Sequence, residues 1–207
     1  MWNQLPERYG KWNSVYRVFN RWSHSGFFGS ILEGLAAKAK ETRKVRALDG
    51  SHCKAHQDAC RSPQKPEEQG LGKTKGGRNT KISAVVNSQG KATRIEIVPG
   101  NLHDSKCAIS TLGPDLDDCD VLADKAYDSK EIRNYIESKN GRPNIPSRKN
   151  AKNPASYNKE LGKWRHIVEN FFCRIKRFRR VATRYEKLSC TYLCFVTLAS
   201  LVDWMDE

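Results

Sequence analysis

Two short apolar segments that each end in an aspartate constrain the fold of this chain most. The segment "VRALD" ends at Asp49, and the segment "DVLAD" ends at Asp124. Segments this short and this apolar are typical of buried β-strands. If the two strands lie parallel and adjacent, both aspartates emerge at the carboxyl edge of one sheet, which is where α/β proteins form their ligand sites.

The segments around these two strands predict a mixed α/β fold. Two alternating segments joined by the turn "SQGK" predict a β-hairpin, and apolar residues at helical spacing predict helices after it. In order, we expect strands at 81–87 and 92–100, helices at 104–112 and 129–141, a short edge strand at 142–147, and helices at 164–184 and 192–202. This order predicts a sheet that is part antiparallel and part parallel, with helices packed against it.

A helical hairpin is predicted at the start of the chain. Val15, Phe19 and Trp22 recur at helical spacing, Gly26 interrupts the pattern, and a second helix begins after it. We therefore expect residues 1–42 to form a helical N-terminal segment. A helix pair of this kind fits a DNA-reading helix-turn-helix and a simple packing module equally well.

The positive charge of the chain is concentrated. The formal net charge is +14, and residues 142–187 hold fourteen Lys and Arg against three acidic residues. Residues 53–80 are rich in Lys, Gln, Pro and Gly and lack an apolar period, so they predict a basic loop. A concentrated basic region predicts an anionic partner such as nucleic acid.

Cysteine and apolar content predict a cytoplasmic protein without a membrane partner. The seven cysteines are an odd number, which is typical of reduced thiols. The most apolar run, residues 192–202, has eleven residues and is too short to span a bilayer. We expect it to form a buried helix.

A single acid, Glu169, stands in the basic segment "WRHIVENFFCRIKRFRRVATR" at 164–184. In a helix with roughly 100° per residue, Arg165, Phe172 and Lys176 share its side, and an apolar set faces the opposite side. That set is Ile167, Val168, Phe171, Ile175 and Phe178. Glu169 could be a surface ion-pair partner of Arg165, or a carboxylate held among cations against a polyanion.

Asp49, Asp124 and Glu169 together make an all-oxygen ligand set. Such a set suits Mg²⁺ or Mn²⁺ better than zinc. Two ions of this kind activate a nucleophilic oxygen and stabilise the leaving oxygen in an in-line phosphoryl displacement. The simpler alternative for each aspartate is a turn or helix cap.

Five motifs occur in order along the chain: "VRALDGSHCKAH", "GRNTKI", "PGNLHDSK", "VLADKAYDSKEIRNYI" and "RHIVENFFCRIKRFRRVATRYEK". They closely resemble the bacterial insertion-sequence DDE transposases of the insertion-sequence-5 type, and the likeness runs from about residue 2 to the C-terminus. The resemblance implies a ribonuclease-H-like catalytic domain over residues 43–207, a mixed sheet flanked by helices. It also implies that a triad of Asp49, Asp124 and Glu169 holds two Mg²⁺ or Mn²⁺ ions.

The resemblance further implies an activity and its partners. A transposase of this type binds the terminal inverted repeats of its insertion sequence, cleaves a DNA strand, and transfers that strand to target DNA. The expected partners are double-stranded DNA of the transposon end and of the target, and a second copy of the chain in a synaptic homodimer at the bacterial nucleoid. Two alternatives stay open: a truncated or inactive copy that acts only as a DNA-binding inhibitor, and a ribonuclease-H-like nuclease without strand transfer.

Around the glutamate the family pattern is Tyr, two residues, Arg, three residues, Glu, six residues, Lys. Arg165 and Lys176 fit this pattern around Glu169, but Gly162 stands at the tyrosine position. The resemblance implies that Arg165 and Lys176 hold phosphates beside the triad. The other arginines of the segment are expected to follow the duplex backbone: Arg174, Arg177, Arg179, Arg180 and Arg184.

Overall fold

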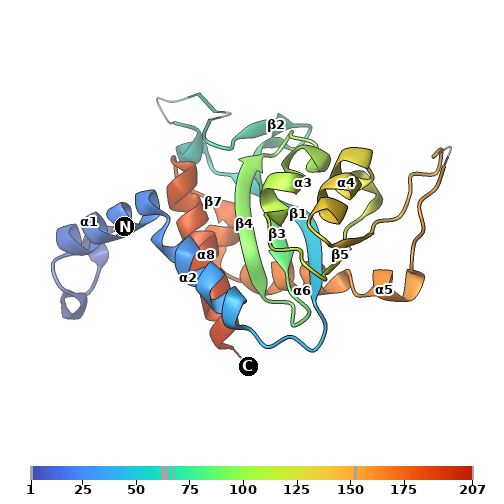
Figure 1. Ribbon diagram of the computed structural model, residues 1–207. Coiled ribbons are helices and arrows are strands. Elements are labelled where there is room, and N and C mark those ends of the chain that lie inside the picture. Colours follow the sequence, from blue (N-terminus) through green and yellow to red (C-terminus); the bar gives the residue numbers. More distant parts are fainter. Residues whose placement is uncertain (1, 62–64, 67, 152, 207) are drawn as a thin grey trace.

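The computed structural model describes residues 2–61, 65–66, 68–151 and 153–206, in which a mixed sheet lies between two groups of helices (Figure 1). The strands are β1 (Val45–Ala55), β2 (Gly72–Thr74), β3 (Gly77–Val86), β4 (Ala92–Pro99), β5 (Asp120–Leu122), β6 (Arg142–Asn144) and β7 (Thr183–Arg184). The α-helices are α1 (Trp12–Ser25), α2 (Phe27–Lys38), α3 (Asp104–Leu112), α4 (Lys130–Ser138), α5 (Lys159–Lys163), α6 (His166–Ile175), α7 (Arg179–Ala182) and α8 (Ser189–Met205).

Strand β1 is the centre of the sheet. It pairs antiparallel with β3 and parallel with β5, and these two strands pair in turn with β4 and β6. The path β4-β3-β1-β5-β6 therefore joins an antiparallel hairpin to a parallel set, as the sequence predicts. With helices on both faces of this mixed sheet, the ribonuclease-H-like fold is confirmed.

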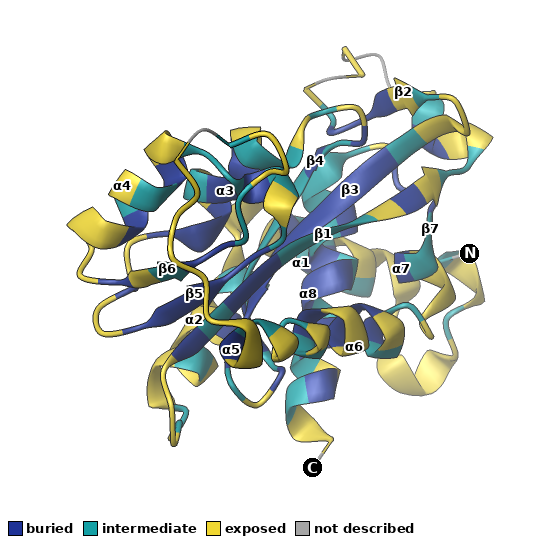
Figure 2. Ribbon diagram, turned by 90° about the vertical axis from the view of Figure 1, so that its right-hand side faces the viewer, coloured by how far each residue is buried: buried dark blue, intermediate teal, exposed yellow. Residues whose placement is uncertain are grey.

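Each face of the sheet has its own hydrophobic core, because successive side chains of β1 point to opposite faces. Ala47 packs in a cluster with Phe171 of α6 and with residues of α2 and α8. Leu48, the next residue, packs in a second cluster with Ile132 of α4 and with residues of α3. The sheet separates these two helical layers (Figure 2). Helix α6, which carries Glu169, is thus fixed beside β1 by the first core.

The predicted strand end at Asp49 is wrong. β1 continues to Ala55, because β3 pairs with it along residues 47–54 and β7 pairs with its last residues. Past Asp49 the burial alternates, with Cys53 buried and Lys54 exposed, so this half lacks the continuous apolar character of the first. The expectation that the two aspartate-bearing strands are parallel and adjacent is confirmed in β1 and β5.

The single basic helix predicted at 164–184 is also wrong. Helix α6 is followed by the one-turn helix α7, and Thr183–Arg184 form β7 against the end of β1. The break lets the chain turn back to give the last residues of β1 a hydrogen-bonding partner. Phe172 is buried in the core instead of sharing the solvent side of Glu169, and Phe178 beyond the end of α6 is 43% exposed.

The basic loop predicted at 53–80 is partly wrong. Its first residues complete β1, a 3-10 helix follows at Gln57–Cys60, and the hairpin of β2 and β3 occupies its end. Residues 62–64 and 67 of the predicted loop lie outside the described residues.

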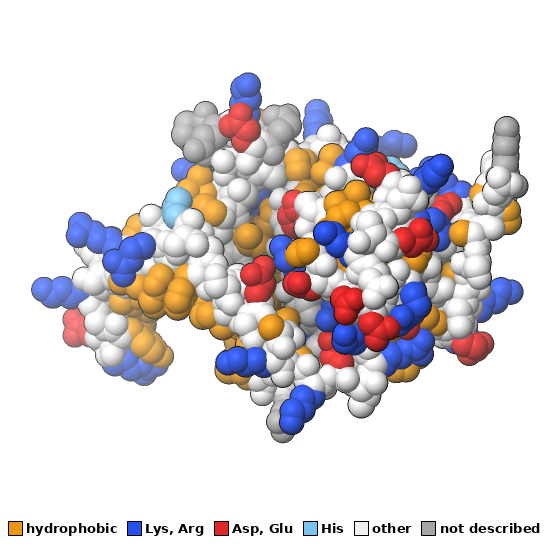
Figure 3. Space-filling model, in the orientation of Figure 1, with side chains coloured by type: hydrophobic (Ala, Val, Ile, Leu, Met, Phe, Trp, Pro, Cys, Tyr) orange, Lys and Arg blue, Asp and Glu red, His pale blue; other side chains and the backbone are white. Residues whose placement is uncertain are grey.

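The helical hairpin predicted at the start of the chain is confirmed. Gly26 adopts φ +70 between α1 and α2, a left-handed conformation that glycine takes without strain. α2 inserts Leu32 into the first core, and Phe19 of α1 contacts Phe195 of α8. Hydrophobic side chains gather over this N-terminal part of the surface (Figure 3). None of the described helices is both long and apolar enough to cross a membrane.

Candidate active site

Asp49 and Asp124 lie level with each other where the β1 and β5 pairing ends. Ala47 pairs with Leu122 in the last parallel register, and each aspartate stands two residues beyond its member of that pair. The chain after β5 leaves the sheet at this point, whereas β1 continues. The two carboxylates are close enough that the charge of Asp124 raises the pKa of Asp49.

Asp49 is a strongly perturbed carboxylate. The Gly50 amide donates to its Oδ1 at 2.8 Å, and Arg165 donates to its Oδ2 at 3.3 Å. Burial is the largest effect and raises the pKa of Asp49, and the charges of Asp124 and Glu169 raise it further against the lowering effect of these two donors. The net shift is upward, with burial of the carboxylate as its largest cause.

Asp124 caps the 3-10 helix that follows it, Lys125–Tyr127. The Ala126 amide donates to its Oδ1 at 2.7 Å. The cap that sequence reasoning left open as the simpler alternative is therefore present here. It fixes the direction of the Asp124 side chain beside Asp49.

Arg165 lies between Asp49 and Glu169. Its Nη2 is 2.6 Å from Oε1 of Glu169, one helical turn away, while its Nη1 contacts Asp49. The predicted ion pair of Glu169 with Arg165 is therefore present. The other interpretation, a carboxylate held among cations against a polyanion, stays a prediction. The Arg165 side chain is 32% exposed and that of Glu169 is 51% exposed, so both can reach solvent.

Lys176, at the end of α6, binds β1 just beyond Asp49. Its Nζ donates to Oγ of Ser51 at 2.6 Å and to the carbonyl of His52 at 2.9 Å. Burial lowers the pKa of His52, and the charges of Lys81 and Lys176 lower it further. Lys176 therefore reaches the same strand as Asp49, from the same helix as Glu169.

A half-buried ion pair that sequence reasoning missed lies beside Asp49. Lys81 of β3 donates to Oδ1 of Asp104 at 2.6 Å, and its side chain is 4% exposed. A Cβ on Gly50 would lie 3.0 Å from Lys81 and 3.3 Å from Asp104, so glycine lets this pair pack directly against β1. The glycine after Asp49 is the sequence signal that could have indicated such a close approach.

The three acids have the donor chemistry of a site for a hard divalent cation. Among the described residues, no group of three His, Cys, Asp or Glu side chains stands arranged to hold a metal ion. The three acids are not gathered around one point, because the Arg165 guanidinium lies between the carboxylates of Asp49 and Glu169. A divalent cation bound beside Asp49 would offset the burial and the neighbouring acids that raise the pKa of this carboxyl.

The family model of the transposase DDE domain matches residues 40–200 of this chain. The chain belongs to this transposase family. A protein of Brucella ovis, provisionally named as a transposase for insertion sequence element IS6501, is 35% identical over 127 residues, which cover 61% of this chain and 98% of that relative. No solved structure matches the chain. The kinship with bacterial insertion-sequence DDE transposases is confirmed, and the insertion-sequence-5 type stays a prediction.

The remaining arginines of this transposase fall into two groups. Arg177 and Arg179 are exposed, as a DNA contact requires. Arg174 instead pairs with Asp203 of α8 at 2.5 Å, and Arg180 pairs with Glu186 at 2.5 Å. These four stay predicted DNA contacts, of which Arg174 and Arg180 already form ion pairs within the protein.

The predicted DNA contact of Arg184 is wrong. Its side chain is fully buried and donates to the carbonyls of Gln69, Glu186 and Lys187, while its guanidinium lies 5.4 Å from the ring centroid of Tyr192. Burial lowers the pKa of Arg184. This arginine holds the fold together behind β7.

Gly162, at the tyrosine position of the family pattern, faces the side chain of Tyr157. The Tyr157 hydroxyl lies in the space that a Cβ on Gly162 would need. Glycine at position 162, where the family pattern has tyrosine, therefore leaves room for the side chain of Tyr157.

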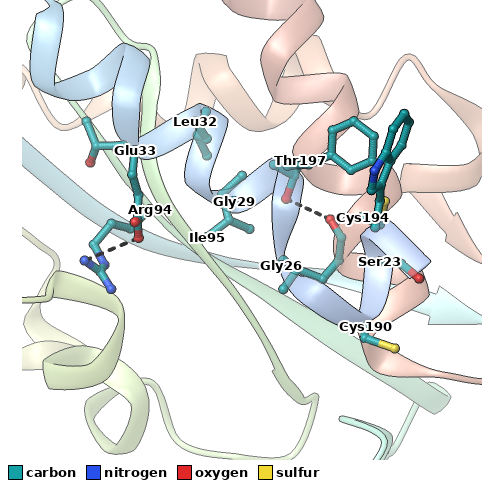
Figure 4. Close-up of a pocket in the computed structure, with 14 residues that line it drawn as sticks. Ser23, Gly26, Gly29, Leu32, Glu33, Arg94, Ile95, Cys190, Cys194 and Thr197 are labelled. Carbon is teal, nitrogen blue, oxygen red and sulfur yellow. Dashed lines mark hydrogen bonds and ion pairs between the residues drawn. The ribbon is translucent and has the colours of Figure 1, made fainter. Parts of the chain in front are cut away.

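A cavity of about 100 Å³ lies between α2, β4 and α8, and none of the three acids lines it. Figure 4 shows Cys190, Cys194 and Thr197 of α8 facing Gly29 and Leu32 of α2 across it. Its walls carry large apolar side chains, thiols, small residues and one ion pair, Glu33 with Arg94. Nothing in this lining matches the phosphoryl chemistry of the acid cluster, and we assign it to the packing of α2 against α8.

Proposed function

We propose that this transposase catalyses DNA transposition of an insertion sequence, with Asp49, Asp124 and Glu169 as its catalytic acids. The observation that carries the proposal is their convergence: one acid comes from the central strand, one from the end of its parallel neighbour, and one from the helix packed on that strand. Membership of the transposase family supports DNA as the substrate.

The donor set supports two Mg²⁺ or Mn²⁺ ions held by these three acids. Carboxylate oxygens are the ligands that both ions prefer. When bound, such ions lower the barrier to in-line displacement at a phosphate, with water as nucleophile in cleavage and a DNA 3′-hydroxyl in strand transfer. The protein's part is to hold the acids in place, and the β1–β5 register and the Asp124 cap support that role.

Arg165 has a double role in this proposal. Without DNA it neutralises Asp49 and Glu169. With DNA bound, a phosphate competes for the same guanidinium, which suits bidentate contact with phosphate oxygens. Release of Arg165 would leave the acids free to bind cations, so that DNA binding and cation binding support each other. Lys176 and the exposed Arg177 and Arg179 would hold the backbone nearby.

The N-terminal helices are proposed to assist in end binding, as a segment over residues 1–42 ahead of the catalytic domain at 43–207. The exposed cations Arg17 and Arg21 on α1 suit contacts with DNA. A homodimer is proposed for the synaptic complex, because two transposon ends must be cut together. Action at the nucleoid in the bacterial cytoplasm follows from the proposed substrate.

The test is a cleavage and joining assay on duplexes that end in the terminal repeats of the element, with Mg²⁺ or Mn²⁺. We expect wild-type protein to nick the ends and join them to target DNA, and Asp49→Asn, Asp124→Asn and Glu169→Gln to do neither while still binding the duplex. Nicking without joining would favour a nuclease. Binding without nicking by the wild type would favour a DNA-binding inhibitor.

A further inference from the structure

Lys176 is a fixed cation that neutral oxygens hold in place. Its Nζ donates to Oγ of Ser51 at 2.6 Å and to the carbonyl oxygen of His52 at 2.9 Å. No carboxylate among the described residues forms an ion pair with it, whereas Lys81 on the neighbouring strand β3 binds Asp104 at 2.6 Å. The charge of Lys176 is therefore positioned but not neutralised, and it stays available to an anion.

The Ser51 hydroxyl and the Lys176 ammonium each retain a donor that no described residue accepts. Because Oγ of Ser51 accepts from Lys176, the O–H of Ser51 points elsewhere, and it donates to nothing in the part of the chain that the structure describes. An ammonium has three N–H donors, and two of those on Lys176 are used. Both side chains are partly exposed, so the pair presents one O–H and one N–H to solvent.

Ser51 stands on the same face of β1 as Asp49. Side chains of a strand alternate between its two faces, and Gly50 between them faces an ion pair on the opposite side. Two residues of an extended strand span roughly 7 Å, which is close to the distance between neighbouring phosphates of one DNA strand. Lys176 approaches Ser51 from the end of α6, about two helical turns after Glu169.

We propose that Ser51 and Lys176 together bind the DNA phosphate next to the one that is attacked. The inference rests on the proposed function, in which the acids around Asp49 act on the attacked phosphate. The oxygens of the neighbouring phosphate accept from the hydroxyl and from the ammonium, and hydrogen bonds to a charged group are short and strong. Contacts of this kind carry no sequence information, but they fix the register of the DNA strand relative to the acids.

The test uses terminal-repeat duplexes in which a neutral methylphosphonate replaces one phosphate at a time. Affinity is measured by fluorescence anisotropy without divalent cations, so that no strand is cut. Replacement of the phosphate next to the cleavage position should weaken wild-type binding by about tenfold. In Ser51→Ala we expect weaker binding of the unmodified duplex and a penalty at that one position that is about threefold smaller or less, because one contact is already absent.

Two further variants complete the test. Lys176→Gln should reduce the penalty at the same phosphate and at no other. Ser88→Ala is the matched control, because the Ser88 hydroxyl also donates to a charged side chain, that of Glu41 at 3.1 Å, in the turn between β3 and β4. It should leave every penalty at its wild-type value. The Tm of each variant, measured by calorimetry, sets a temperature at which all of them are folded.

Two results would overturn the inference alone. One is a wild-type set of penalties in Ser51→Ala, which would mean that the hydroxyl only anchors α6 to β1. The other is a reduced penalty at a phosphate that is not the neighbour of the cleaved one, which would contradict the register. Wild-type protein that binds no terminal-repeat duplex would remove the proposed function together with the inference, so the two failures are distinguishable.

Discussion

The aspartates at the two ends of the β1–β5 strand pair have opposite electrostatic surroundings. At the start of β5, Asp120 is bound by Arg43 at 2.9 Å and by Arg142 at 2.8 Å. Four residues further along, roughly 13 Å away in an extended strand, Asp124 and Asp49 stand side by side with other acids.

The pKa values report this difference. Burial alone would raise the pKa of Asp120, but the hydrogen bonds from Arg142 and Arg43 outweigh it and lower the pKa. At the other end, burial and the neighbouring acids raise the pKa of Asp49. Asp120 is held in ion pairs with two arginines, whereas Asp49 is a largely buried carboxylate with further acids beside it, an arrangement typical of functional sites.

The largest expected effect is on DNA cleavage, which should depend on Asp49 and not on Asp120. Asp49→Asn should lower DNA cleavage by at least about a thousandfold, because it removes a ligand of ions that lower the barrier by several kcal/mol. Asp120→Asn should leave cleavage unchanged at a temperature where the variant is folded. Rates on a terminal-repeat duplex measure both, and equal losses in the two variants would contradict the division between the ends.

The second expected effect is on stability, and here the substitution of Asp120 does the damage. Asp120→Asn should lower the free energy of unfolding by about 1 to 2 kcal/mol at pH 7, since Asp120 is buried but its arginine partners are about half exposed. Because its folded pKa is depressed, the stability due to Asp120 is present above its unfolded pKa and is lost as pH falls through the folded value. Urea unfolding between pH 7 and pH 3 would show the difference between the variant and the wild type disappear in acid.

A third, smaller effect has the opposite sign. Asp49→Asn should raise the free energy of unfolding by roughly 0.5 to 1 kcal/mol at pH 7 without divalent cations, as removal of uncompensated site charge often does. Because the folded pKa of Asp49 is raised, the native state binds more protons than the unfolded state, so the penalty grows as pH rises through that window. The gain should therefore shrink as pH falls toward 4. A loss of stability at pH 7 would mean that Asp49 is a structural acid like Asp120.

The smallest expected effect concerns the exposed arginines. Arg179→Ala should reduce the slope of log affinity against log salt by about 0.9, the value for one phosphate contact on duplex DNA. Arg43→Ala, at the other end of the sheet, is the matched control and should leave the slope unchanged. Filter binding at several salt concentrations measures both, and equal reductions would mean that DNA covers both ends alike.

The sequence predicted most of the sheet and pointed to three acids that lie near one another in the structure, and their catalytic role stays a prediction. The apolar runs before Asp49 and Asp124 correctly predicted parallel neighbours, and the alternating segments correctly predicted the β3–β4 hairpin. The length of β1 could not be predicted from the sequence. Residues 51–55 are held in the sheet by pairing with β3 and with the distant β7, and not by their own apolar character.

Counting the cations of the basic segment gave a wrong prediction where an arginine binds a partner that is distant in the sequence. Arg184 counts as one more cation of a basic segment, yet its hydrogen-bond acceptors include a carbonyl of Gln69 more than a hundred residues earlier. Arg174 likewise pairs with Asp203 on another helix.

The most direct test of the division between the two ends is thermal unfolding of the protein bound to a terminal-repeat duplex, at pH 7 with and without Mn²⁺. Binding to the folded state alone adds about 2.7 kcal/mol of stability at a concentration one hundred times the Kd. We predict that Mn²⁺ raises the Tm of the wild type and of Asp120→Asn by the same amount, and that it does not raise the Tm of Asp49→Asn. An equal rise in Asp49→Asn would show that the cation binds elsewhere and would contradict the assignment of this acid cluster as the catalytic site.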